Sequence, residues 1–513
     1  MPVQMSWSGW GDPAKATPLP ESVTTLLREL LGVQPRDESP VALSDIAPPE
    51  PRLDQDVLAA LGKIAEVRAD AEERVRHTGG KSTPDLLRIR RGDTSQTPDA
   101  VVLPATHEDV LGVLELATAH GFAVVPFGGG TSVVGGLAPE APAFVALDLR
   151  RLDELLEVDE VSRTATLQVG LRGPRAEELL GERGYTIGHF PQSFEWASIG
   201  GFAAARSSGQ SSAGYGRFDE LVVGMTVATP SGTLTLGRAQ KSAAGPDLRQ
   251  LVLGSEGAFG VITSLTVRIR PLPEVRLYEG WRFPDFASGA AALRRLSQDG
   301  PMPTVLRLSD ETETMVGLAR TETIGEGDSG CLAIVGYEGQ AGEVAVRRDR
   351  THAVLSSLGG TALGAGPGES WEHGRFGAPY LRDSLLDVGA FVETLETTTF
   401  WSNIPVLYEA VKAALPGHLV MCHISHVYAS SASLYFTIVS GRIGRDADWD
   451  EAKTAVNEAI IAAGGSISHH HGVGTEHRAA YAEEIGPLGV EVLRAVKRSL
   501  DPAGILNPGI LVP

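Results

Sequence analysis

The sequence contains very little cysteine and no long hydrophobic run. Only two cysteines, Cys331 and Cys422, occur among 513 residues, so we expect neither a disulfide framework nor a metal site built from cysteine alone. No stretch of about 18 apolar residues is present, so we expect no transmembrane helix. The first residues, M-P-V-Q-M-S-W-S-G-W-G, lack a basic segment followed by an apolar core. We therefore expect no secretory signal and a cytoplasmic protein.

Positive charge is also scarce. The chain has 44 lysines and arginines against 64 aspartates and glutamates, which gives a formal net charge of -20. This sign argues against nucleic acid or an anionic membrane as a partner, and any anionic substrate must be held by local positive groups. The hydrophobic fraction of 42% is ordinary for a globular protein, and a chain of this length predicts at least two domains.

Glycine, in contrast, is concentrated at one point. The apolar residues 122–125 predict a buried strand, and P-F-G-G-G-T-S-V-V-G-G follows from Pro126 to Gly136, with five glycines in nine positions. Such a backbone can adopt positive φ and approach a ligand closely, and its N–H groups can converge on a phosphate. Taken alone, the same stretch is equally compatible with a glycine-rich surface turn, because glycine motifs match many unrelated loops.

Two further stretches are rich in small residues. Residues 191–216 contain S-F-E-W-A-S-I-G-G and several serines, and residues 253–262 read L-G-S-E-G-A-F-G-V-I before a predicted strand at 263–269. Either one extended ligand contacts all three stretches or they are three unrelated loops. No G-x-G-x-x-G opens a helix, so the standard dinucleotide-binding fingerprint is absent.

Strand and helix patterns alternate around these stretches, and P-L-P-E at 271–274 marks a domain boundary. Apolar spacing predicts helices over 53–75, 107–120, 174–184, 449–463 and 489–500, and strands over 100–104, 143–148, 164–169, 305–308, 331–337 and 434–439.

The three stretches, in this order, resemble the FAD-binding domain of the vanillyl-alcohol oxidase/p-cresol methylhydroxylase (PCMH-type) superfamily. In that superfamily P-x-G-G-G-T-S binds the flavin pyrophosphate, S-x-E-x-x-S-x-G-G lines the isoalloxazine, and G-x-E-G-x-x-G-V-I closes on the nucleotide. The terminal D-P-A-G-I-L-N-P-G also resembles it. The resemblance covers residues 98–513 and implies an α+β fold, with an FAD-binding domain in two subdomains and an α/β cap domain that contains an antiparallel sheet.

The resemblance also implies a domain division and a cofactor site. The expected units are a helical N-terminal extension (1–95), the FAD-binding domain (96–275), the cap or substrate domain (276–460) and a C-terminal active-site segment (461–513) that packs back on the FAD-binding domain. Some relatives carry a flavin-linked histidine in the glycine loop; this loop has none, so we expect non-covalent FAD. The implied cofactor-binding residues are Pro126, Phe127, Gly128, Gly129, Gly130, Thr131, Ser132, Gln192, Ser193, Phe194, Glu195, Trp196, Ala197, Ser198, Ala205, Arg206, Ser207, Ser208, Glu256, Gly257, Ala258, Phe259, Gly260, Val261 and Ile262.

The second half of the chain is most similar to the alkyldihydroxyacetonephosphate synthase family. P-Y-L-R-D places Arg382 at the family's active-site arginine, and L-Y-F places Tyr435 at its catalytic tyrosine. G-G-S-I-S-H-H-H-G-V-G places His469, His470 and His471 on its triple-histidine motif. The N-terminal W-S-G-W-G also resembles this family, and Arg375 in the same segment as Arg382 is a second candidate arginine.

A rival within the superfamily is the flavin-dependent D-2-hydroxy-acid dehydrogenase, whose H-x-G-D-G-N-x-H and G-E-H-G-x-G motifs can hold a divalent metal. Here the first motif becomes H-V-Y-A-S-S-A-S-L-Y and the second becomes H-H-H-G-V-G. A site so poor in carboxylates suits an oxyanion better than a hard cation, so we expect no metal. The nearby Cys422, His423, His426 and Glu476 keep a metal site open to test.

The resemblance implies an enzyme that exchanges the acyl chain of acyl-dihydroxyacetone phosphate for a fatty alcohol through an adduct at flavin N5, in ether lipid synthesis. Flavin would then do no net redox chemistry, and the protein would orient it and supply acid–base groups. The alternative is an FAD-linked oxidase or dehydrogenase of a D-2-hydroxy acid such as lactate or glycolate. A flavin-binding protein without turnover is the third hypothesis.

Tyr435 is the candidate for proton transfer. A free phenol has a pKa of about 10, and histidine cations nearby would lower that pKa; otherwise the residue is a core tyrosine. Neighbours in an extended segment alternate in direction, so His469–His471 cannot all face the substrate. Arg382 can bind a phosphate or carboxylate in bidentate fashion, or simply pair with Asp383. We expect a homodimer, and a lipid substrate would permit peripheral membrane contact, although no residue implies it.

Overall fold

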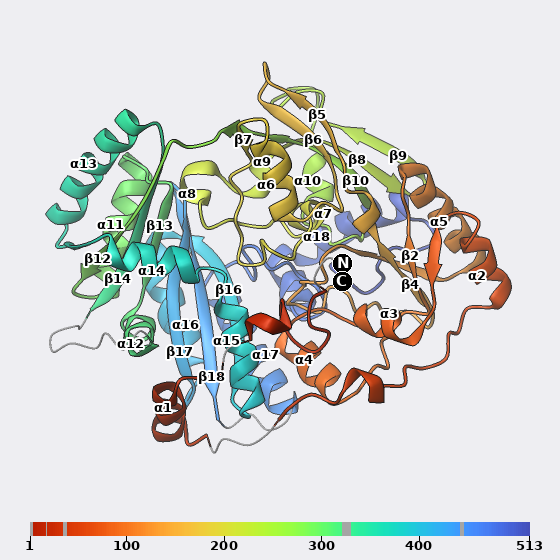
Figure 1. Ribbon diagram of the computed structural model, residues 1–513, viewed down its shortest axis with the longest axis horizontal. Coiled ribbons are helices and arrows are strands. Elements are labelled where there is room, and N and C mark those ends of the chain that lie inside the picture. Colours follow the sequence, from red (N-terminus) through yellow and green to blue (C-terminus); the bar gives the residue numbers. More distant parts are fainter. Residues whose placement is uncertain (1–3, 17, 34–37, 321–329, 442–445) are drawn as a thin grey trace.

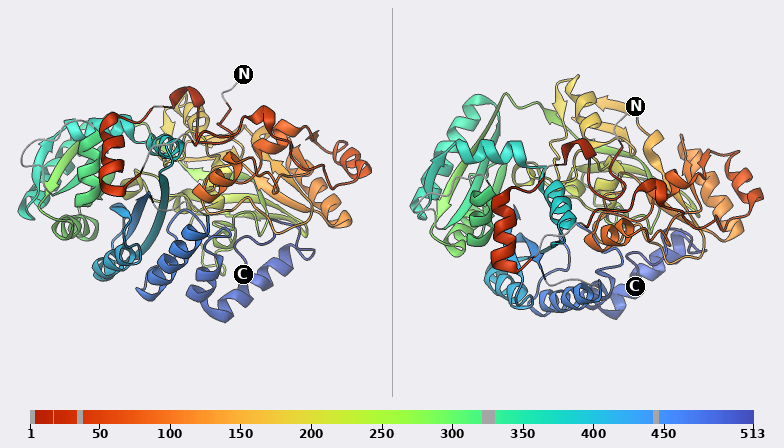
Figure 2. Two further views of the ribbon diagram at one scale, coloured as in Figure 1. Left: turned by 90° about the horizontal axis from the view of Figure 1, so that it is seen from below. Right: turned by 60° about the horizontal axis from the view of Figure 1, so that its bottom comes forward.

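The computed structural model describes the chain except residues 1–3, 17, 34–37, 321–329 and 442–445. In the described residues a four-stranded, a five-stranded and a seven-stranded sheet form the framework, with one two-stranded ribbon. The orange and yellow half, which carries the first two sheets, lies beside the green and cyan half, which carries the third (Figure 1). The blue C-terminal helices lie along the bottom of the molecule in Figure 2. None of the described helices combines the length and apolarity needed to cross a bilayer.

The first sheet delivers the glycine loop. Its strand order is β1-β2-β4-β3, and β2, β4 and β3 are parallel. The helix α5 (His107–His120) confirms the sequence prediction; it begins with a capping box between Thr106 and Asp109 and ends at Gly121 in the left-handed conformation. The strands are β1 (Glu66–Arg68), β2 (Ala100–Leu103), β3 (Ala123–Phe127) and β4 (Phe144–Asp148).

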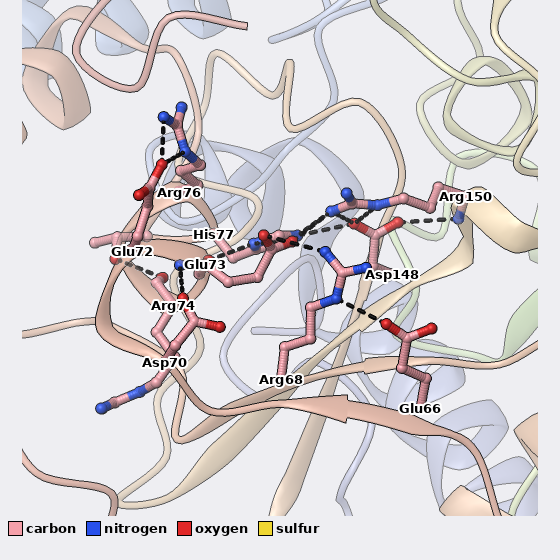
Figure 3. A network of polar contacts seen from close by, with 11 residues as sticks. Glu66, Arg68, Asp70, Glu72, Glu73, Arg74, Arg76, His77, Asp148 and Arg150 are labelled. Atoms are coloured by element: carbon pink, nitrogen blue, oxygen red, sulfur yellow. Dashed lines mark hydrogen bonds and ion pairs between the residues drawn. The ribbon is translucent and has the colours of Figure 1, made fainter. Parts of the chain in front are cut away.

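A polar network holds the strand end from which the glycine loop departs (Figure 3). His77 contacts the ring of Phe127, with 4.4 Å between ring centroids, and its Nε2 lies 2.8 Å from Oδ2 of Asp148 at the end of β4. Arg150 donates to Glu73 (2.9 Å) and also pairs with Asp148. Burial raises the pKa of Asp148, but the contacts with His77 and Arg150 outweigh burial and hold it below its usual value. The carboxylate of Asp148 is therefore charged. It holds the end of β4 directly and the end of β3 through His77, which packs on Phe127.

The five-stranded sheet shares one apolar core with the first sheet and is antiparallel throughout, in the order β5-β6-β10-β8-β9. Its strands and covering helices are β5 (Leu155–Asp159), β6 (Thr164–Gln168), β8 (Val222–Thr229), β9 (Gly232–Leu236), β10 (Val261–Arg268), α6 (Gly173–Gly181) and α7 (Ile199–Ala204).

The seven-stranded sheet is also antiparallel, in the order β15-β12-β14-β13-β17-β18-β16. Leu434 and Phe436 of β18 belong to its apolar core, so Tyr435 between them points to the opposite face. The strands are β12 (Val275–Phe283), β13 (Val305–Ser309), β14 (Cys331–Gly339), β15 (Thr361–Gly364), β16 (Phe391–Phe400), β17 (Leu419–Val427) and β18 (Ser431–Ser440).

The edge strand β16 joins the two halves of the molecule. Thr398 forms a bridge with Ser466 of the C-terminal segment, and Thr397 Oγ1 donates to the Ser466 carbonyl (2.6 Å). At the other end of the strand, Thr83 Oγ1 donates to the carbonyl of Val392 (2.5 Å). The edge of the seven-stranded sheet, which would otherwise be open, is thereby covered. The same contacts bring the triple-histidine segment to the polar face of this sheet, called the cap sheet below.

Two helix predictions differ from the structure. Residues 53–75 were expected to form one helix, but they form α2 (Gln55–Leu61), the strand β1 and α3 (Ala71–Arg76), because β1 pairs with β2 and Asp70 caps α3. The helix expected at 489–500 is the second part of α18 (Arg478–Leu500), which is kinked where Gly486 has a φ of 70° before Pro487.

The remaining elements are short or cover the sheets. They are α1 (Glu21–Leu31), α4 (Thr83–Arg90), α8 (Ser212–Tyr215), α9 (Phe218–Leu221), α10 (Arg249–Val252), α11 (Phe286–Asp299), α12 (Glu311–Arg320), α13 (Ala341–Ser357), α14 (Gly366–Gly374), α15 (Ala378–Asp387), α16 (Ile404–Ala413), α17 (Asp446–Ala462), β7 (Tyr185–Thr186) and β11 (Arg270–Pro271), with 3-10 turns at Pro13–Lys15, Leu43–Asp45, Leu149–Arg151 and Trp401–Asn403.

Candidate active site

The glycine loop packs directly on the second glycine-bearing stretch. A Cβ atom on Gly129 would lie 2.8 Å from the carbonyl carbon of Trp196 and closer still to its oxygen, and one on Gly128 would lie 3.3 Å from Cβ of Ser198. A side chain at either position has no room, so glycine is required there for the two backbones to touch. A Cβ on Gly136 would lie 3.3 Å from Oε1 of Glu256 in the third stretch. The three stretches therefore meet in one place.

The third stretch and the C-terminal motif complete the cradle. The backbone N–H of Glu256 donates to the carbonyl of Ala204 (3.0 Å). The side-chain amide of Asn507, from the terminal D-P-A-G-I-L-N-P-G, donates to the carbonyls of Gly136 (3.1 Å) and Glu256 (2.7 Å). Arg206, Glu256 and Asn507 all adopt a positive φ, at 51°, 50° and 40°. Such conformations cost about 1–3 kcal/mol each and concentrate at functional sites.

The cradle fits a flavin. Nε2 of Gln192 and Nε1 of Trp196 are buried hydrogen-bond donors with no acceptor among the described residues. Buried donors are normally satisfied, so these two indicate an absent acceptor-rich group. An isoalloxazine carries ring nitrogens and carbonyl oxygens that accept such bonds. The glycine-lined backbone next to them suits the pyrophosphate.

Not every residue assigned to the cofactor lies at the cradle surface. Glu195 pairs with Lys15 (2.9 Å) at a partly exposed position. Arg206 directs its Nε to the carbonyl of Leu253 (2.8 Å) and so braces the loop. Four further residues of the third stretch are buried in apolar clusters: Ala258, Phe259, Val261 and Ile262. The binding of FAD by these residues stays a prediction.

The triple-histidine turn is organised by a glutamate that sequence reasoning did not single out. Glu396 of β16 accepts the backbone N–H groups of His469 (2.6 Å), His470 (3.1 Å) and His471 (2.8 Å) and the hydroxyl of Ser468 (2.5 Å). Its side chain is buried, with 1% exposure. Burial raises its pKa, but the contact with His470 outweighs burial and holds the pKa well below its usual value.

Tyr435 lies against the histidines, as expected. Its ring centroid is 5.6 Å from that of His471 and 6.1 Å from that of His470, and it stacks on His423 at 4.8 Å. The expected direction of its pKa shift is wrong. Burial raises the pKa of Tyr435 to about 12, and burial lowers the pKa of His469 and brings that of His471 to about 3. Desolvation leaves both imidazoles neutral, so they supply no cation to the phenol.

A second layer extends the cluster. His426 stacks on His469 at 5.0 Å, and its Nδ1 lies within hydrogen-bond distance of the hydroxyls of Ser212 (2.7 Å) and Ser208 (3.0 Å). Tyr428 contributes a hydroxyl 2.8 Å from Nε2 of His469. One nitrogen each of His426, His469 and His470 lies within 4.8 Å of the others. Three imidazoles are a ligand set that zinc accepts, but Tyr428 and His470 already engage the nitrogens of His469.

Arg382 is paired inside the protein. Its Nε and Nη2 lie 3.2 Å and 3.1 Å from Oδ1 of Asp383, and its Nη1 donates to the carbonyl of Lys81 (2.6 Å). Lys81 in turn donates its backbone N–H to Ser132 of the glycine loop (2.6 Å) and its ammonium to the carbonyl of Trp7 (3.1 Å). The W-S-G-W-G segment thus docks here, and the positive charge of Arg382 acts on Tyr435 from within the site.

Comparison with known proteins agrees with this geometry. The model "FAD binding domain" matches residues 98–237, and "FAD linked oxidases, C-terminal domain" matches residues 272–511. Alkyldihydroxyacetonephosphate synthase of Dictyostelium discoideum is 32% identical over 99% of this chain and 94% of that protein, and the Trypanosoma brucei brucei protein is 34% identical over 87% and 78%. A solved structure of alkyldihydroxyacetonephosphate synthase superposes with a TM-score of 0.83, at 30% identity and 98% coverage of each chain.

These matches define the class as FAD-linked enzymes with an FAD-binding domain and a C-terminal domain built on a large antiparallel sheet, which confirms the fold expected from the sequence. Within that class, the chain belongs to the alkyldihydroxyacetonephosphate synthase family.

The buried histidines predict a stability that falls in mild acid. Burial lowers the pKa of His189, His471 and His477 to about 3, so the unfolded chain binds more protons than the folded one below about pH 6.5. The stability they contribute is complete above that pH and is lost as the pH falls. Burial raises the pKa of Glu256 and Glu476 to about 7. These two carboxyls therefore add to the stability of the folded protein as the pH falls, in the opposite sense to the histidines.

His189 isolates this effect because it packs between Phe202 and Phe218 and lies outside the triple-histidine turn. For His189→Gln we expect the loss of unfolding free energy between pH 7 and pH 5 to be smaller than in the wild type by about 2 kcal/mol. Urea unfolding at the two pH values measures this difference. The exposed His120→Gln is the control, and an equal pH dependence in His189→Gln and wild type would refute the interpretation.

Proposed function

We propose that this chain exchanges the acyl group of acyl-dihydroxyacetone phosphate for a fatty alcohol, as an alkylglycerone-phosphate synthase in ether lipid synthesis. One observation carries the proposal: Tyr435 and the histidines ordered by Glu396 gather on the polar face of the cap sheet. The same histidine turn is tied to the cradle, because Glu256 accepts the backbone N–H of Val473 (2.9 Å) and Gly474 (3.1 Å). A proton-transfer group and the flavin cradle are thus built as one unit.

We extend this proposal to organisation and cofactor binding. The division into residues 1–95, 96–275, 276–460 and 461–513 is proposed to separate the N-terminal extension, the FAD-binding domain, the cap and the active-site segment. FAD is proposed to bind without a covalent bond, because the loop Pro126–Gly136 contains no histidine. A cytoplasmic homodimer, with peripheral contact to membranes that hold its lipid substrate, completes the proposal.

The cofactor-binding residues are proposed in three groups, following the three stretches. When bound, FAD supplies an electron-accepting ring to which a substrate carbon can be attached. The glycine loop with Thr131 and Ser132 holds the pyrophosphate, Gln192 and Trp196 donate to the ring, and Glu256 braces the loop against the histidine turn.

Proton transfer is assigned to Tyr435 and the histidines. With a pKa of about 12, the Tyr435 hydroxyl is protonated at neutral pH and can donate a hydrogen bond or a proton. His470 is placed to accept a proton, because its Nδ1 lies 3.4 Å from Oε2 of Glu396, whose charge would stabilise an imidazolium. His469 and His471 fix this geometry.

The Tyr435→Phe variant tests the role of the hydroxyl. We expect turnover to fall by about 10²–10⁴-fold, the range that a positioned proton-transfer group supplies, while FAD is retained because the ring still packs on His423. Steady-state kinetics with the flavin content measured on the same samples checks both statements. Tyr185→Phe, in the short strand β7, is the control. Unchanged turnover in Tyr435→Phe would remove Tyr435 from the mechanism.

The direct assay of the proposed function is product formation. FAD-loaded protein is incubated with acyl-dihydroxyacetone phosphate and a labelled fatty alcohol, and the lipid extract is analysed. We expect the label in an ether-linked phosphate together with one free fatty acid per turnover. Absence of a labelled ether under conditions where FAD is bound would count against the proposal.

A further inference from the structure

We propose that Arg375 forms the oxyanion site that binds the phosphate group of the substrate; this rests on the proposed function and assigns its phosphate subsite. The protein has a net charge of -20, so a phosphate ester needs a local cation to hold it. Arg382 was the expected residue, but its guanidinium is already paired with Asp383.

Arg375 differs from Arg382 in having no carboxylate partner. Among the described residues no ion pair includes Arg375, and its Nη1 is buried without a hydrogen-bond acceptor. A guanidinium carries five donors in a planar fork that matches a phosphate. A buried, unsatisfied nitrogen on such a group indicates a ligand that brings the missing acceptor.

Aromatic rings hold this guanidinium without using its donors. Cζ of Arg375 lies 4.9 Å from the ring centroid of Phe376, 5.2 Å from that of Phe190 and 5.7 Å from that of Trp371. Cation–π contacts occupy the faces of the guanidinium and leave its N–H edge free. Trp371 lies in α14, Phe376 in the turn after it, and Phe190 directly before the second glycine-bearing stretch. The cation is therefore fixed where the cap meets the FAD-binding domain.

The position of Arg375 links it to the reacting groups. Nε2 of Gln210 donates to the Arg375 carbonyl (3.0 Å), while Oε1 of Gln210 is buried and has no donor. The serines on either side of Gln210, Ser208 and Ser212, both have hydroxyls within hydrogen-bond distance of His426, which stacks on His469. One short segment therefore contacts the histidine cluster at its ends and Arg375 at its centre. The backbone of Arg375 and the histidine cluster are thus supported by the same segment.

The flavin side of this subsite is also defined. Phe376 stacks on Phe194 with 5.7 Å between centroids, and Phe194 belongs to the stretch expected to line the isoalloxazine. A leaving fatty carboxylate is an oxyanion too, but a phosphate monoester carries more negative charge and offers three acceptor oxygens to the guanidinium. The proposed ligand is therefore the phosphate monoester of the substrate.

Ligand binding to the FAD-loaded full chain tests the assignment, with dihydroxyacetone phosphate as the probe, followed by calorimetry. We expect Arg375→Lys, which keeps the charge but loses the fork, to weaken binding by roughly 10-fold, and Arg375→Gln by roughly 100-fold or more. The exposed Arg350→Lys on α13 is the matched control. In the synthase assay the same variants should raise KM for the phosphate ester more than they lower kcat.

Two further probes separate the outcomes. Neutral dihydroxyacetone should bind far more weakly than its phosphate, and hexanoate should compete poorly. Wild-type affinity for dihydroxyacetone phosphate in Arg375→Gln, or stronger binding of hexanoate than of the phosphate, would overturn the proposal. If binding depends on Arg375 while the wild type makes no ether lipid, the phosphate site stands and the proposed reaction fails.

Discussion

The Glu396→Gln variant is expected to lose at least about 100-fold in turnover and about 3–5 kcal/mol in the free energy of unfolding. Glu396 accepts three consecutive backbone N–H groups and one hydroxyl in a buried site. Glutamine retains one acceptor oxygen and turns an amide N–H₂ toward groups that only donate. Each backbone N–H left without an acceptor costs about 1–3 kcal/mol, so the histidine turn must open.

The controls for this variant come from the same strand and from the surface. Glu393 is equally buried, but burial raises its pKa whereas the pKa of Glu396 is lowered. The protein therefore stabilises the charge of Glu393 less, and Glu393→Gln should cost less than half as much. Glu458→Gln, on the exposed side of α17, should be neutral. Urea unfolding and steady-state kinetics measure the three variants together. A Glu396→Gln protein as active as the wild type would show that the carboxylate does not order the histidines.

The Gly129→Ala variant should fail to retain FAD. A Cβ at this position would lie 2.8 Å from the carbonyl carbon of Trp196 and 2.9 Å from Cα of Ala197, both backbone atoms that cannot rotate away. The glycine loop and the ring-lining stretch must then separate, and the phosphate-binding N–H groups lose their convergence. We expect FAD affinity to fall by at least about 100-fold, and folding stability by about 1–3 kcal/mol as for other overpacked sites.

The flavin-to-protein ratio after gel filtration, from visible absorbance, measures this prediction. Gly181→Ala is the control, because a Cβ there meets nothing within 4 Å and the residue lies in the helix α6. That variant should bind FAD normally and gain up to about 1 kcal/mol, the usual preference of a helix for alanine. Full flavin retention in Gly129→Ala would place the cofactor elsewhere.

Local signals predicted local structure. The helix α5 was predicted to its boundaries because its N-cap, apolar spacing and terminal glycine all lie within its own sequence. Residues 53–75 show apolar spacing that also fits a helix, yet β1 forms there because it pairs with β2. This partner lies more than 30 residues further along the chain. Pairing between distant segments decides such cases, and a single sequence does not reveal it.

The site divides in the same way. The motifs placed Tyr435 and the histidine trio in one site, and the structure brings them together. Glu396 was missed because its partners are about 70 residues away and its role depends on the docking of the 466–474 segment on an edge strand. The only sequence signal was two glutamates, Glu393 and Glu396, inside an otherwise apolar and threonine-rich strand. The pKa direction of Tyr435 was wrong because burial, which dominates it, is a property of the folded protein.

The flavin cradle, Tyr435 and the histidine turn are proposed to perform the exchange without net redox. The most direct test mixes FAD-loaded protein anaerobically with acyl-dihydroxyacetone phosphate and a labelled fatty alcohol, and records visible absorbance while the lipid product is quantified. We expect labelled ether lipid to accumulate while the flavin ends in its oxidised form. A flavin that ends in its reduced form, or the absence of labelled ether lipid from protein that holds FAD, would contradict exchange without net redox.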